Sequence, residues 1–266
     1  MSEAPKLRLG GMALRNGLLV HGPTRWAAAV RTRGGEIRVA SGRKPRVPGV
    51  DRVPGVRGMA RLGEAMAVVP LVKAGLPEAE LPFATARVAA VTAGTVIAGS
   101  LLRRRGVVGE AAALGLSVAP AIVALRGGEL AAYHGVEHKA IGAYEQDAAD
   151  AADAAKEHDR CGSHLMAPLL AANLAGVSLL RAAGERPGPA AGSAVALASV
   201  GVAVEVFAWS ERNPDTALAR ALRRPGHELQ RAIGTREPDE RQLEVGRAAL
   251  AEILRVESFP PPTSNH

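Results

Sequence analysis

The sequence predicts a mainly α-helical integral membrane protein, a bundle of about four spans with a small N-terminal β-rich region. Of its 266 residues, 47% are hydrophobic and 3% are aromatic, and the mean hydropathy is +0.06. A positive mean hydropathy beside 22% charged residues indicates that apolar and polar segments are kept apart along the chain. This apolar content excludes a wholly disordered chain, and the single cysteine, Cys161, excludes a disulfide scaffold.

Four apolar segments support the prediction of membrane spans. They are residues 84–102, 107–125, 165–180 and 190–210, with at most one charged side chain each. At about 1.5 Å per residue, a helix of about 19 residues covers roughly 28 Å, close to the ~30 Å hydrocarbon core of a bilayer. Alanine-rich helices are marginal for insertion, so the alternative is that these segments form buried hairpins in a soluble helical bundle.

The segments divide the chain into six regions. We expect a basic β-rich region over 1–58, an amphipathic helix and connector over 59–83, and transmembrane hairpins over 84–125 and 165–210. A loop or helix fills 126–164, and a helical tail fills 211–266. Within the first region, alternating residues on either side of Gly34 and Gly35 predict a hairpin with a two-residue turn. The helix of the second region is expected to break near Pro70.

The charge distribution bears on location. Residues 1–76 hold 14 Lys and Arg against 4 Asp and Glu, which suits the anionic inner face of a membrane. We expect a multi-pass plasma-membrane protein with both termini in the cytosol, since residues 1–25 lack the continuous apolar stretch of a secretory signal. The basic Arg103–Arg105 loop favours the opposite orientation under the positive-inside rule.

The expected partner is the lipid bilayer. A basic N-terminal region is also typical of nucleic-acid binding, but residues 1–61 contain one aromatic side chain, Trp26, that could stack on bases. We therefore expect no nucleic acid. The sequence leaves a homo-oligomer open and does not identify a substrate.

The region 126–164 holds most of the side chains that could perform chemistry. If residues 130–145 are helical, His134, Glu137 and His138 lie on one face. Two imidazoles at i and i+4 can bind one metal ion, and His-x-x-Glu-His is the inverted form of the zinc-protease motif. Glu137 would then be the catalytic base that accepts a proton from water activated by the ion.

Further ligands for such an ion follow in the sequence. Cys161 lies three residues from both His158 and His164, so that a turn could bring a thiolate and an imidazole together. The predicted ligands are therefore His134, His138, His158 and Cys161, and the predicted ion is divalent, with zinc favoured. The structural alternative is that the histidines lie at the membrane surface and that Glu137 forms an ordinary ion pair with Arg160.

Two sequence blocks carry a resemblance to a known family. They are His134-Gly135-x-Glu137-His138-Lys139, followed by Tyr144-Glu145, and His158-x-Arg160-Cys161-Gly162. A C-terminal block, Leu229-Gln230 with Thr235-Arg236-Glu237-Pro238, and weaker glycine matches accompany them. On these residues the chain resembles the DUF1385 (YqhQ-like) family of bacterial membrane proteins, described as predicted metal-dependent enzymes of unassigned reaction. The resemblance implies a retained metal site and supplies no substrate. The family typically has Glu and Arg where this chain has Asn16 and His21, which implies a divergent or altered paralogue if that Glu contributes to a site.

The sequence therefore yields two hypotheses from different classes. The first is a metal-dependent membrane enzyme, a hydrolase with Glu137 as base and the metal held by the 134–161 cluster. The second is a non-catalytic membrane scaffold or transport-related protein, in which the same cluster is structural.

Overall fold

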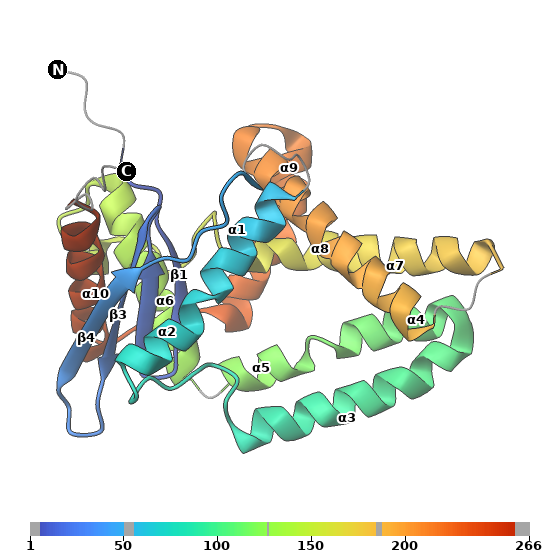
Figure 1. Cartoon of the computed structure of the whole chain (residues 1–266), viewed down its shortest axis with the longest axis horizontal. Helices are drawn as coiled ribbons and strands as arrows, with labels where there is room; N and C mark the ends of the chain where they lie inside the picture. Colours follow the sequence, from blue (N-terminus) through green and yellow to red (C-terminus); the bar gives the residue numbers. More distant parts are fainter. Residues whose placement is uncertain (1–5, 51–55, 127, 185–187, 259–266) are drawn as a thin grey trace.

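The computed structural model describes residues 6–50, 56–126, 128–184 and 188–258. Within these residues the chain forms two parts that lie side by side along the long axis of the molecule (Figure 1). We call them the head, which contains a β-sheet with helices α2, α6 and α10, and the stem, which contains helices α3, α4, α5, α7 and α8. Helices α1 (Arg57–Met66) and α9 (Ala217–Leu229) lie where the two parts meet.

The head is built on a four-stranded antiparallel sheet with its strands in sequence order. The strands are β1 (Gly10–Leu14), β2 (Gly17–His21), β3 (Arg25–Arg31) and β4 (Ile37–Arg43). The hairpin predicted around Gly34 and Gly35 joins β3 to β4, but its turn is longer than expected. Thr32 N donates to Glu36 O at 2.8 Å, so three residues, 33–35, form the loop, and Gly35 supplies the positive φ of +90°.

Helices cover both faces of this sheet. On one face, α6 (Glu129–Gln146) and α10 (Glu240–Ser258) place Val136, Val245 and Ile253 against β2 and β3. On the other face, α2 (Val68–Gly75) packs Val68 and Val72 against the sheet. Because both faces are covered, the central run of β3 is buried continuously instead of alternating between core and solvent.

The helix predicted over 59–83 divides at a different place from the one expected. Helix α1 ends at Met66 and α2 begins at Val68, so the break lies at Ala67 and not at Pro70. Pro70 is in the first turn of α2, where the N–H that proline lacks would have no partner within the helix.

The stem consists of apolar helices. They are α3 (Ala86–Leu102), α4 (Gly106–Leu116), α5 (Ala119–Leu125), α7 (Met166–Ala182) and α8 (Pro189–Arg212). In the described chain, three helical stretches are long and apolar enough to cross a membrane: Ala86–Leu125, Gly162–Ala182 and Ala190–Arg212. The first of them turns back at Arg103–Arg105, so that α4 and α5 pack against α3. The mainly helical class and the small N-terminal sheet are confirmed, with three candidate spans where four were predicted.

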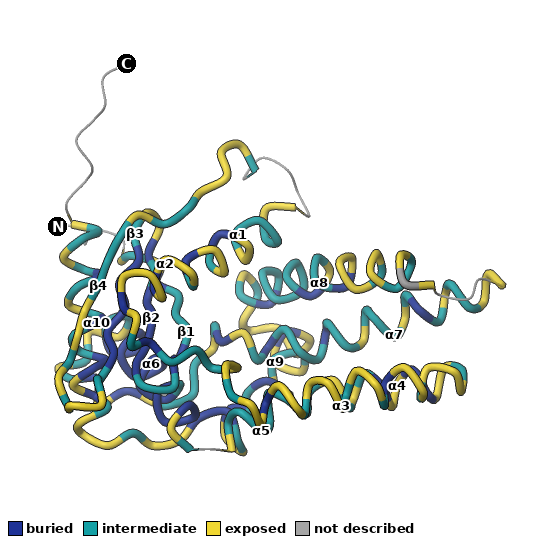
Figure 2. The backbone as a smooth tube through the Cα atoms, turned by 60° about the horizontal axis from the view of Figure 1, so that its bottom comes forward, coloured by how far each residue is buried: buried dark blue, intermediate teal, exposed yellow. Residues whose placement is uncertain are grey.

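Most of the stem is exposed or half-buried, whereas much of the sheet and α6 in the head is buried, as the colours of Figure 2 show. Val96, Ile97 and Leu197 are each more than 60% exposed. Inside the stem lies Glu110, which pairs with Arg103 at 3.1 Å on the same hairpin. It also contacts Arg181 on α7, at 3.8 Å.

The regions that the sequence analysis separated as 1–58, 126–164 and 211–266 share one end of the molecule. Residues from β1–β3, α6 and α10 form one apolar core. The turn at Arg103–Arg105 lies at the far end of the stem (Figure 1).

Candidate metal centre

Helix α6 provides three of the predicted site residues. It spans Glu129–Gln146, so His134 and His138 are separated by four residues and lie on the same face, as the spacing predicts. Nearly all of α6 is buried between the sheet, α10 and the segment after α9. The helix is therefore held on several sides, which fixes the direction of its polar side chains.

Cys161 comes from the loop that follows α6. This loop is held in place by two buried polar side chains, Lys139 of α6 and Gln230 of the segment after α9. Lys139 Nζ donates to the carbonyl oxygens of Ala152, at 3.0 Å, and Ala154, at 2.8 Å. Gln230 Oε1 accepts from His158 N, and Gln230 Nε2 donates to Ser163 Oγ, both at 2.8 Å.

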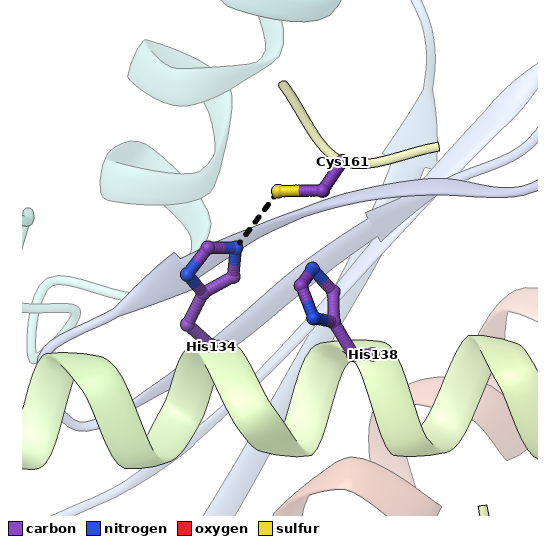
Figure 3. A group of neighbouring side chains, drawn as sticks. All are labelled: His134, His138 and Cys161. Carbon is purple, nitrogen blue, oxygen red and sulfur yellow. Dashed lines mark hydrogen bonds between the residues drawn. The ribbon is translucent and has the colours of Figure 1, made fainter. Parts of the chain in front are cut away.

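Three of the four predicted metal ligands meet at one point (Figure 3). The ligand atoms of His134, His138 and Cys161 all lie within 4.8 Å of one another. His134 Nε2 lies 3.3 Å from Cys161 Sγ, and the two imidazole centroids are 4.4 Å apart. This triad of His134, His138 and Cys161 could hold a metal ion.

Backbone carbonyls set the orientation of both imidazoles in the triad. Nδ1 of His134 hydrogen-bonds Gly234 O at 2.8 Å, and Nδ1 of His138 hydrogen-bonds Lys156 O at 2.6 Å. These bonds leave the Nε2 atoms for the centre of the triad, the arrangement that supports metal-binding histidines. His138 Nε2 is buried and has no hydrogen-bond partner among the described residues. A buried unpaired nitrogen is costly, and a bound cation would satisfy it.

The two imidazoles differ in their proton affinity. Burial strongly lowers the pKa of His138, and the neighbouring His134 lowers it further, so this ring is neutral. Burial also lowers the pKa of His134, but the hydrogen bond with Cys161 and the charge of Glu137 outweigh it and raise the pKa to about 9. Its Nε2 proton then points to the sulfur, and metal binding would have to displace that proton.

Glu137 lies beside the triad and is not one of its three converging members. Its side chain is buried, at 9% exposure, and accepts a hydrogen bond from the backbone of Ala13 on β1. Burial raises the pKa of Glu137, while His134 and His158 act to lower it. A Cβ at residue 11 would lie 2.7 Å from Glu137 Cγ, so the glycine there allows β1 to approach the carboxyl group.

His158, the fourth predicted ligand, lies near the triad without joining it. Its ring centroid is 5.6 Å from that of His138. Its Nδ1 accepts from Arg160 N at 3.2 Å, and its Nε2 faces Glu145 Oε2 at 3.1 Å. Both ring nitrogens are thus already engaged. Arg160, considered above as a partner of Glu137, pairs with Glu145.

Asn16 and His21, which stand where the family typically has Glu and Arg, have different surroundings. Asn16 is structural: its side chain bonds Arg31 O, Glu78 O and Glu80 N, and so ties the β1–β2 turn to the segment after α2. His21 lines the cavity described below, 3.2 Å from Lys44 Nζ.

Some contributors to the site could not be recognised from the sequence. The carbonyls of Lys156 and Gly234 orient the imidazoles, but a backbone oxygen leaves no trace in residue type. Gly234 ends a short π-helix, Gln230–Gly234, that follows α9. The one sequence signal was Gln230 itself, which belongs to the C-terminal matches to the family pattern.

A cavity of about 550 Å³ opens beside the triad. His134, Glu137 and His138 line it from α6, and Cys161 lines it from the loop. Much of the remaining lining is apolar and comes from α1, α5 and Phe83. The triad therefore faces a space large enough for a small ligand.

Comparison with known proteins gives one match. No curated protein and no solved structure matches the chain. The family DUF1385, described as a protein of unknown function, matches residues 129–256. This match runs from the first residue of α6 into the last turn of α10 and includes the whole triad. Residues 129–256, close to half of the chain, belong to the DUF1385 family.

Proposed function

We propose that this protein is a metal-dependent hydrolase of the plasma membrane, with a divalent ion, zinc, held by His134, His138 and Cys161. One observation carries the proposal. The imidazoles of His134 and His138 converge with the thiol of Cys161, the only cysteine of the sequence. One of the converging atoms, His138 Nε2, is buried and has no hydrogen-bond partner among the described residues. Two nitrogens and one sulfur suit zinc, and three protein ligands leave a coordination position open, as catalytic zinc sites do.

The surroundings of the triad support a hydrolytic role. A metal ion bound here would supply a Lewis acid that polarises a carbonyl or phosphoryl oxygen and lowers the pKa of water. Glu137 is the group assigned to accept and return the proton, because it is buried beside the triad and its raised pKa is suited to proton transfer. His158 is not assigned as a ligand, since both of its ring nitrogens are engaged.

The stem is proposed to lie in the bilayer, with α3, α4–α5, α7 and α8 as four arms and the head in the cytosol. The exposed apolar surface of these helices supports this placement, because lipid would cover it, whereas in water it would remain an unfavourable exposed apolar patch. The Arg103–Arg105 turn would then lie at the opposite membrane surface, where Arg103 is paired with Glu110 and its charge is partly offset.

Metal analysis of the full-length protein, purified in detergent, tests the proposal. We expect close to one divalent ion per chain in the wild type and less than a tenth of that in a His134→Ala, His138→Ala variant. His227→Ala is the matched control, because His227 is a partly exposed histidine paired with Asp159 outside the triad. Absence of stoichiometric metal in the wild type, or equal metal in the triad variant, would overturn the proposal.

The scaffold alternative draws on a different observation. The loop carrying Cys161 is tied to α6 by Lys139 and by the His138–Lys156 hydrogen bond, and to the segment after α9 by Gln230. The cluster therefore also helps to hold the head together. In that case Glu137→Gln leaves cellular function intact, while His138→Ala or Cys161→Ala lowers protein abundance. The hydrolase predicts a Glu137→Gln variant that is abundant, retains metal and has lost function.

A further inference from the structure

The cavity beside the triad has two unlike walls. The wall on the side of the sheet and α6 carries His134, Glu137, His138 and Cys161. A second wall is apolar and consists of three segments: α1 with Leu62, Ala65 and Met66, the pair Pro82 and Phe83, and α5 with its N-cap Val118 and with Ala121, Ile122 and Leu125. A ligand that fills this space therefore meets catalytic groups on one side and hydrocarbon on the other.

The apolar wall continues into the stem. Helix α5 is the last part of the apolar stretch Ala86–Leu125, so the residues that line the cavity belong to a segment with the composition of a membrane span. The cavity thus lies where the stem joins the head, at the depth proposed for the membrane surface.

The rim of the cavity is also apolar and exposed. Leu62 is 39% exposed, Met66 44% and Phe83 58%, although all three line the cavity. On α1, Arg57 lies 3.7 Å from Glu205 of α8, which fixes the helix against the stem. An amphipathic helix that combines arginine with exposed Leu and Met is typical of one lying in the membrane interface.

These features identify the chemistry of the occupant. A polar substrate from water would leave its hydrogen-bonding groups unpaired against the apolar wall, at a cost of several kcal/mol. Water is an equally poor occupant of an apolar space. An alkyl chain buries favourably there, at about 0.8 kcal/mol per methylene.

We infer that the site takes an amphiphile with an alkyl chain, drawn from the bilayer between α1 and α5. The chain lies along Met66 and Ile122, and the polar head reaches the triad. The reaction at that head rests on the proposed function, whereas binding of the chain does not require a metal.

Photo-crosslinking tests this inference with the full-length protein in lipid nanodiscs. The probe is palmitic acid with a diazirine close to its carboxyl group, the end expected to lie at the triad, and adducts are mapped by mass spectrometry. We expect adducts on Leu9 and Met12, which line the cavity from the head and which lipids around the stem do not reach. Excess unmodified palmitic acid should remove them.

Two cavity-filling variants and one matched control complete the experiment. Ile122→Trp and Met66→Trp act from two different segments of the apolar wall, α5 and α1, and each should reduce the Leu9 and Met12 adducts at least fivefold with metal content unchanged. Val96→Trp adds similar bulk on the exposed surface of α3 and should leave the adducts as in the wild type. Because Met66 is already 44% exposed, its replacement should not disturb folding.

The outcomes distinguish the alkyl-chain site from the proposed metal-dependent hydrolase. Absence of competable adducts at Leu9 and Met12, or undiminished adducts in both cavity variants, overturns the alkyl-chain site. Adducts that persist in the His134→Ala, His138→Ala variant support it, because chain binding is then independent of the metal. A wild-type protein that shows these adducts but contains no metal retains the chain site and refutes the hydrolase.

Discussion

The head and the stem use the same apolar residues in opposite ways. In the head, Leu18, Val136 and Ile253 are completely buried. In the stem, Val96, Val108 and Leu179 are between 64% and 82% exposed, while Glu110 is among the buried residues. The difference supports the proposal that the two parts are built for different solvents: the head folds by removing hydrocarbon from water, whereas the stem leaves hydrocarbon on its outer surface.

The largest expected effect comes from removing a buried side chain of the head. Ile253→Ala leaves a cavity between α10 and the sheet and should cost about 2–5 kcal/mol of stability. Leu197→Ala, at a residue 61% exposed on α8, should change stability by about 0.5 kcal/mol or less.

Thermal unfolding of the full-length protein in detergent measures this pair. The chain has two tryptophans, and Trp26 lies in the head, so a Trp209→Phe background makes fluorescence report on the head. Equal losses of stability in Ile253→Ala and Leu197→Ala would contradict the difference in side-chain burial between the head and the stem.

A charged side chain on the outer surface of the stem tests directly whether that surface faces lipid or water. Val96→Asp should cost about 2.5–3.5 kcal/mol of insertion free energy, because the carboxylate would face hydrocarbon. The fraction of protein in the membrane pellet should fall. Val39→Asp, at a half-exposed residue of β4 in the head, is the control and should leave that fraction unchanged. A soluble, well-folded Val96→Asp protein would place the stem in water.

Two helical glycines, one in the head and one in the stem, should differ in how well they tolerate an added methyl group. A Cβ at Gly135 of α6 would lie 2.3 Å from Arg236 O, a backbone atom that cannot move freely. Gly135→Ala should therefore destabilise the head by about 1–3 kcal/mol. Gly94→Ala in α3 meets no atom within 4 Å and should be neutral or stabilise by about 0.5–1 kcal/mol. Melting curves of the two variants should shift in opposite directions, and a common shift would contradict the close packing of α6.

The smallest effect is a dependence of head stability on pH. Burial and the nearby Lys44 lower the pKa of His21 from 6.5 to about 4. Between these values the unfolded chain binds more protons than the folded one, so stability falls as the pH falls from about 6.5 towards 4. His138, His158 and His164 also have lowered pKa values and act in the same direction.

His21→Gln should remove about 1 kcal/mol of the stability difference between pH 7.5 and 5.5. Melting temperatures at the two pH values measure it. The apolar segments of the stem contain no histidine, so the dependence should be confined to the head signal. An unchanged pH slope in the variant would mean that the His21 imidazole is not kept neutral by its surroundings.

Local patterns predicted the parts of the molecule that local forces determine. The spacing of His134 and His138 was sufficient to place both on one helix face, and the hairpin after Trp26 followed from alternation around two glycines. The apolar segments were found by length and composition. The sharp reversal at Arg103–Arg105 was visible as a charged interruption of an otherwise apolar stretch.

What depends on distant contacts could not be predicted. Sequence spacing placed His158 among the ligands, but the direction of its ring is set by Arg160 N and Glu145. The role of Asp239 was missed in the same way. Its carboxylate accepts a hydrogen bond from Gln242 N at 2.8 Å at the start of α10, as a helix cap does. Nor does any local pattern show that α10 packs on a sheet more than 200 residues earlier in the chain.

That last contact has a consequence for how the protein is made. The sheet leaves the ribosome before the stem helices, and the helix that closes its core leaves after them. While the stem helices are being synthesised, Leu18 and Val20 of the sheet therefore lack their contacts with α10. A chain that stops before α10 would carry all of the apolar stem helices but would lack the helix that completes the core of the head, so the triad would lie in an open domain.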